Sequence, residues 1–206
     1  MPTLGPRPRW ELPVLGVLAV LTFAVIPIGI TNIYGGLPAH PLFVHVPVVF
    51  IPLAAIGGLV LMARPGWLAG AAGSWVGLAA VIALGSLDLT MSAGDKLRAA
   101  LGLEGDRPGA VHLVAEHAAA AGDLRALTIA FVAVYLVCLA VAATADASSG
   151  VPVGDRIFAS IRRAPGAAIA LRVLSALLAL ACLYYVFRVG DLGAKAVWLS
   201  RLPAAR

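Results

Sequence analysis

Four histidines are the residues of this chain best suited to bind a metal or a haem. They form two equally spaced pairs, His40 with His45 and His112 with His117. Side chains five residues apart on one helix diverge by roughly 140°, so neither pair is suited to hold one metal from a single helix. One imidazole from each of two helices fits better, because helical bundles hold a b-type haem between facing side chains. We expect His45 and His117 to be the iron ligands, with His40 and His112 as supporting residues or alternative ligands.

Three acidic residues are candidates for orienting these imidazoles: Asp88, Glu116 and Asp191. Glu116 lies four residues after His112, so the two share one face of a helix. Asp88 ends an apolar run, where a carboxylate either orients a histidine or is a solvated helix terminus. Asp191 lies four residues before Lys195, which is the spacing of a surface ion pair.

The histidines also have a purely structural interpretation. The segment HPLFVHVP, residues 40–47, contains Pro41 and Pro47, and Pro52 follows closely. A proline inside a helix removes one backbone hydrogen bond and kinks the helix, which leaves a carbonyl that an imidazole can bind. The chain shows no Ser/His/Asp arrangement and no phosphate-binding glycine loop. Its two cysteines, Cys138 and Cys182, lie inside apolar runs and are expected to be inert.

The composition is that of an integral membrane protein. Of the 206 residues, 61% are hydrophobic and only 12% are charged, and the mean hydropathy is +0.97. A soluble domain is nearer half apolar and a quarter charged. The net charge of +5 is spread over several loops, which favours contact with lipid head groups and argues against nucleic-acid binding. The lipid bilayer is therefore the expected environment.

Five apolar runs approach or reach the length needed to cross a bilayer as a helix, which is about 20 residues. They are residues 13–30, 41–62, 68–87, 126–142 and 168–187. The pattern predicts an all-α, polytopic membrane bundle of about five transmembrane helices. We expect the first run to be a retained helix, because it is longer than the apolar region of a signal peptide.

The chain divides into an N-terminal transmembrane helix, 1–36, and a membrane core of four helices, 37–206. The longest polar connection, 88–125, is expected to contain a short amphipathic helix at 95–103 and then a helix that begins near Ala110. A second amphipathic helix, around residues 157–163, is expected to lie on the membrane surface.

All four histidines are expected on one face of the membrane. With five spans, residues 31–39, the connection 88–125 and the C-terminal residues lie on the same side. Arg7 and Arg9 precede the first run, and no lysine or arginine follows it in residues 31–39. The positive-inside rule therefore favours a cytoplasmic N-terminus and an exported histidine face.

The chain resembles a bacterial membrane-protein family known only as a domain of unknown function, DUF2231. The resemblance covers roughly residues 37–198. The matching features are the HPLFVHVP segment, the small-residue run that ends at Asp88, His117 at the start of the next span, and the closing segment from Gly190 to Trp198. Where some members carry a histidine in that closing segment, this chain has Asp191.

The resemblance implies a four-helix core in the bacterial inner membrane, with the first span as an addition. Fusions of family members to Rieske-type domains imply a redox setting, which favours haem over structural histidines.

Two functions are open from the sequence. The first is an integral membrane electron-transfer subunit that binds b-type haem through histidines from two helices, with other membrane or redox subunits as partners. The second is a cofactor-free accessory or structural subunit of a larger membrane complex, such as a respiratory complex. Both describe a subunit rather than a stand-alone enzyme. A small transporter or metal-handling protein is less well supported, because no span is polar along its length.

Overall fold

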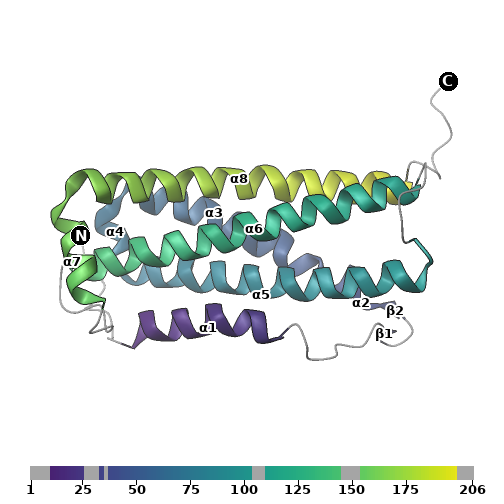
Figure 1. Ribbon diagram of the computed structural model, residues 1–206, viewed down its shortest axis with the longest axis horizontal. Coiled ribbons are helices and arrows are strands. Elements are labelled where there is room, and N and C mark those ends of the chain that lie inside the picture. Colours follow the sequence, from purple (N-terminus) through teal and green to yellow (C-terminus); the bar gives the residue numbers. More distant parts are fainter. Residues whose placement is uncertain (1–9, 26–32, 35–36, 104–109, 145–153, 199–206) are drawn as a thin grey trace, which may run out of the picture.

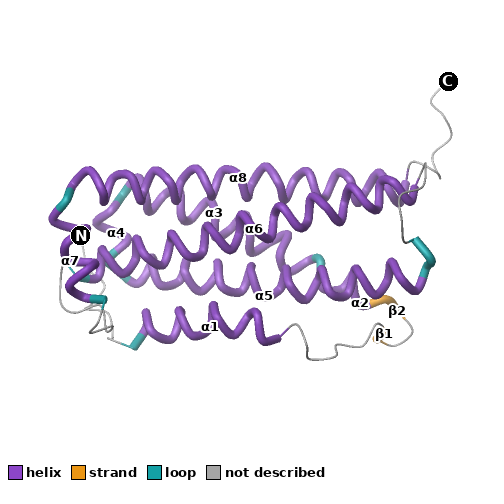
Figure 2. Tube along the Cα trace, viewed as in Figure 1, coloured by secondary structure: helices purple, strands orange, loops and turns teal. Residues whose placement is uncertain are grey.

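The computed structural model is an elongated bundle of helices (Figure 1). It describes residues 10–25, 33–34, 37–103, 110–144 and 154–198, and nearly all of these are helical (Figure 2). The elements, in chain order, are α1 Glu11–Val25, β1 Ile33–Tyr34, β2 Leu37–Pro38, α2 Ala39–Phe43, α3 His45–Ala63, α4 Pro65–Leu68, α5 Ala71–Ala100, α6 Ala110–Ala143, α7 Asp155–Arg163 and α8 Pro165–Trp198. The two short strands pair antiparallel, Ile33 with Pro38 and Tyr34 with Leu37.

Among the described residues, four helical stretches are long and apolar enough to cross a membrane. They are Ala39–Ala63, which joins α2 and α3, then Ala71–Ala100, Val111–Ala143 and Pro165–Trp198. The apolar helix α1 is shorter and lies alongside α5 (Figure 1). The predicted all-α, polytopic membrane bundle of about five spans is confirmed. The amphipathic helix expected near residues 157–163 is also present, as α7.

The helix that was expected to end at Asp88 continues for three more turns, so that prediction was wrong. It absorbs the segment predicted to form a separate amphipathic helix, because residues 88–100 contain no proline. The helix ends where Gly102 takes a φ of +63°. The amides of Gly102 and Leu103 donate to the carbonyls of Ala99 and Arg98, which is the Schellman pattern of a glycine-terminated helix.

The apolar run that begins at Pro41, in which the prolines were expected to kink a single helix, is divided into two helices at Val44. Pro47 has no N–H to donate to the carbonyl of Phe43, and its ring crowds that carbonyl, so the helix is interrupted there. Pro47 consequently lies in the first turn of α3, where the missing N–H is tolerated, and only Pro52 remains inside the helix. The break places His40 on α2 and His45 on α3.

Helices α3 and α6 each pack against both α5 and α8, and these four long helices form the core. Small residues of α5 allow close approach. A Cβ built on Gly77 would lie 3.2 Å from a methyl of Leu15 in α1 and 3.6 Å from the ring of Tyr135 in α6. Tyr135 is fully buried, and its hydroxyl donates to the carbonyl of Gly73 over 2.8 Å.

Tyr135→Phe is expected to lower the free energy of unfolding by about 1 kcal/mol, since it removes one buried hydrogen bond and leaves the ring packing unchanged. Equilibrium unfolding in mixed detergent micelles, followed by circular dichroism, measures the change. Tyr184→Phe is the matched control, because Tyr184 is 59% exposed. Equal effects of the two substitutions would show that the Tyr135 hydroxyl bond does not stabilise the fold.

Candidate functional site

The structure brings together two of the four histidines, His40 of α2 and His117 of α6. Their ring centroids are 6.3 Å apart and their planes are nearly perpendicular, at 89°. Both side chains are half-buried. They lie at the end of the bundle that also holds α2 and the β1–β2 pair (Figure 1). We call this end the histidine end.

Each of these two imidazoles binds a backbone carbonyl through Nδ1. The Nδ1 of His40 lies 2.9 Å from the carbonyl oxygen of Thr90 in α5, and that of His117 lies 2.9 Å from the carbonyl oxygen of Val189 in α8. A carbonyl oxygen only accepts, so each Nδ1 must carry the proton and donate it. In a neutral imidazole the other nitrogen, Nε2, then keeps its lone pair. Metal-binding histidines are commonly held in this way.

A glycine lies against each imidazole, on the same helix as the carbonyl that binds it. A Cβ built on Gly94 would lie 2.9 Å from the Nδ1 of His40, and one built on Gly193 would lie 3.1 Å from the Cε1 of His117. Both distances are shorter than an ordinary contact with a Cβ. A larger residue at either position would therefore require the imidazole ring to shift. This role was not predicted from the sequence, where its only signal is a glycine inside each helix.

The other two histidines lie outside this pair. His45 is exposed, and its Nδ1 is 3.4 Å from the carbonyl oxygen of Leu42 in the preceding turn. His112 is exposed and lies 3.5 Å from Glu116, the partner its spacing predicts. His45 was predicted to lie opposite His117, whereas the structure places His40 there. The reason is the break at Val44, which separates the two histidines of the first pair onto different helices.

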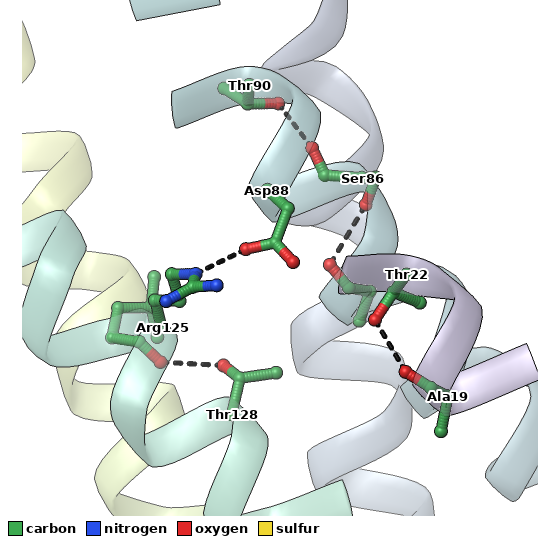
Figure 3. A network of polar contacts seen from close by, with 9 residues as sticks. Ala19, Thr22, Ser86, Asp88, Thr90, Arg125 and Thr128 are labelled. Atoms are coloured by element: carbon green, nitrogen blue, oxygen red, sulfur yellow. Dashed lines mark hydrogen bonds and ion pairs between the residues drawn. The ribbon is translucent and has the colours of Figure 1, made fainter. Parts of the chain in front are cut away.

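A buried ion pair links α5 and α6 deeper in the bundle. The Nε of Arg125 donates to Oδ1 of Asp88 over 2.5 Å, and the two side chains are 32% and 1% exposed. Figure 3 shows the Asp88 carboxylate directed toward Arg125. The second carboxylate oxygen, Oδ2, is buried and has no hydrogen-bond partner among the described residues. Asp88 is therefore neither a solvated helix terminus nor a hydrogen-bond partner of a histidine.

Asp191 pairs with Lys195 over 2.6 Å on the surface of α8, which confirms the surface ion pair that the spacing predicts. Cys138 and Cys182 are buried and not disulfide-bonded. Within the described ranges, no group of three or more His, Cys, Asp or Glu side chains is arranged to hold a metal ion. The donor set of the candidate site is thus two imidazoles.

No family model, curated protein or solved structure matches this chain. Its class therefore rests on its own fold and site. It is a polytopic, helical membrane protein with two imidazoles from different helices in contact at one end of the bundle.

Proposed function

We propose that this protein is an integral membrane electron-transfer subunit that holds a b-type haem between His40 and His117. The observation that carries the proposal is the hydrogen bonding of the pair. Each ring donates its Nδ1 proton to a carbonyl of another helix. The two Nε2 atoms are thereby left as ligands, and the carbonyls and the neighbouring helices hold the rings in place.

The number of ligands favours haem over a bare metal ion. A structural zinc site takes four protein ligands and a catalytic site three, whereas the described residues bring two imidazoles together. A haem iron needs only axial ligands from the protein, because the porphyrin supplies four nitrogens. The distance between the two imidazole rings is also compatible with a haem iron. The two ring centroids are 6.3 Å apart, and metal–nitrogen bonds of about 2.0–2.1 Å would allow two imidazoles at this separation to bind one metal.

The haem would supply one-electron chemistry, and the chain would set its potential through the two imidazoles and the apolar helices around them. The site lies at an end of the bundle, so the partner that exchanges electrons with it would be a membrane or redox subunit docked at the histidine end. Together, the resemblance to DUF2231 and the arginines before the first span support the bacterial inner membrane, with this end on the exported side.

The test is an absorption spectrum of the protein purified in mild detergent and supplemented with haemin. We expect one haem per chain and a sharp α-band after reduction with dithionite. A colourless protein with no co-purifying metal would overturn the proposal. The remaining function would then be that of a cofactor-free accessory subunit of a larger membrane complex, in which His40 and His117 serve only to join helices.

A further inference from the structure

The order of helices along the chain repeats. Helices α2 and α3, then α4 and α5, form one unit, and α6, α7 and α8 form a second (Figure 1). Each unit leaves the histidine end through a long helix, turns in a short helix at the opposite end, and returns through another long helix. Helices α3 and α6 both pack against α5 and α8. If α3 is exchanged with α6 and α5 with α8, the same pairs of helices are therefore in contact.

The buried positions of α3 and α6 have the same register when counted from the histidine of each unit. The two helices can be aligned by placing His40 on His117 and counting along the chain from there. In this alignment, every buried residue of α3 coincides with a buried residue of α6. In order, the pairs are Pro47 and Leu124, Ile51 and Thr128, Ala54 and Phe131, Ala55 and Val132, Gly58 and Tyr135, Leu61 and Cys138, and Met62 and Leu139.

The surroundings of the two imidazoles repeat as well. In α5 the carbonyl of Thr90 binds His40, and Gly94, four residues later, lies against the ring. In α8 the carbonyl of Val189 binds His117, and Gly193, four residues later, lies against that ring. Each half of the site therefore consists of one imidazole from the first helix of a unit, with a carbonyl and a glycine from the last.

Two pairs of residues that occupy the same position in the two units lie against each other. This is what a two-fold axis requires of residues close to it. His40 contacts His117 at the histidine end. Further along the bundle, a Cβ built on Gly58 would lie 3.9 Å from the ring of its counterpart Tyr135. Two such contacts at different depths indicate an axis along the bundle.

We infer that the core is a duplicated unit with an internal two-fold axis, and that His40 and His117 are equivalent halves of one site on that axis. Gly94 and Gly193 are the positioning residues of the two halves. The duplication rests on packing and hydrogen bonding alone, while the ligand rests on the proposed function. Such a site would suit a ligand that can be held in the same way from two sides, as a planar metal macrocycle can.

Nitrogen-15 NMR of histidine-labelled, haem-free protein in detergent tests the equivalence without any ligand. We expect His40 and His117 to show the same tautomer, protonated at Nδ1. Gly94→Ala should shift the His40 signals, and Gly193→Ala should shift those of His117 to a similar extent. Gly122→Ala and Gly190→Ala are matched controls, because a Cβ at either position meets nothing within 4 Å.

In the haem-loaded protein, Gly94→Ala and Gly193→Ala should each weaken haemin binding by about 10–100-fold, as loss of support for a metal ligand commonly does. Their effects should be alike, while the two controls bind normally. Different tautomers, or a response at only one glycine, would overturn the duplication even if haem binds. Matching tautomers and glycine responses in a protein that binds no haem would keep the duplication and reject the proposed function.

Discussion

His117→Ala is expected to abolish tight haem binding, with the dissociation constant for haemin rising more than about 100-fold. Loss of a group that merely supports a metal ligand commonly costs about 10–100-fold, and this substitution removes a ligand itself. It also frees the Val189 carbonyl in α8, which lies in the half-buried wall of the site. Titration of the purified variant with haemin, followed by the change in visible absorption, measures the affinity.

His40→Ala is expected to have the same effect, because its imidazole is the one that faces His117. His45→Ala and His112→Ala are the matched controls. Each removes an imidazole from the same end of the bundle, but both side chains are exposed, so haem binding should be unchanged. Loss of binding in His45→Ala with normal binding in His40→Ala would instead support the pairing of His45 with His117 that was predicted from the sequence.

Arg125→Met is expected to lower the free energy of unfolding by about 3–5 kcal/mol, which is the usual cost of removing one partner from a buried ion pair. It leaves the carboxylate of Asp88, only 1% exposed, inside an apolar bundle without a counter-charge. Methionine is flexible enough to fill the space of the arginine stem, so the loss reports on charge rather than packing. Equilibrium unfolding in detergent micelles gives the value.

Asp88→Leu is expected to cost less, because Arg125 is 32% exposed and its long side chain can turn its charge toward water. The double variant, Asp88→Leu with Arg125→Met, should recover most of the stability, since an apolar pair often replaces a buried ion pair without loss. Three variants of equal stability would contradict this account. That result would mean that the Asp88 carboxylate is neutral or hydrated in the folded protein.

The helical bundle could be predicted from the sequence because apolar runs of transmembrane length leave the backbone no alternative to a helix in lipid. The ends of the helices were harder to place. Asp88 suggested a helix end because charged residues are rare inside spans, but the residue that neutralises it, Arg125, comes from another helix and lies 37 residues away. A local pattern cannot reveal such a partner.

The histidine pair was predicted only in part. The sequence indicated one imidazole from each of two helices, and His117 as one of them. The choice between His40 and His45 depended on the rotation of a helix that breaks at Val44, and that break follows from the missing N–H of Pro47. The repeat was invisible in the sequence because apolar residues of any size suit a membrane core. Gly58 and Tyr135 hold equivalent positions although one has no side chain and the other has a large ring, and the rings of Phe131 and Tyr135 both lie against Gly58.

The ion pair between Asp88 and Arg125 joins the two units, and the positions equivalent to it in α3 and α8 hold no ion pair. When His40 is aligned with His117, the residue equivalent to Arg125 is Val48. When Gly94 is aligned with Gly193, the residue equivalent to Asp88 is Phe187. The carboxylate lies on the helix whose carbonyl binds His40, and the guanidinium lies on the helix that carries His117. The two imidazoles thus have matching hydrogen bonds, but a negative charge lies on the helix that binds one of them and a positive charge on the helix that carries the other. In the proposed centre, the repeated packing would make the two sides alike, while this ion pair would make them electrically different.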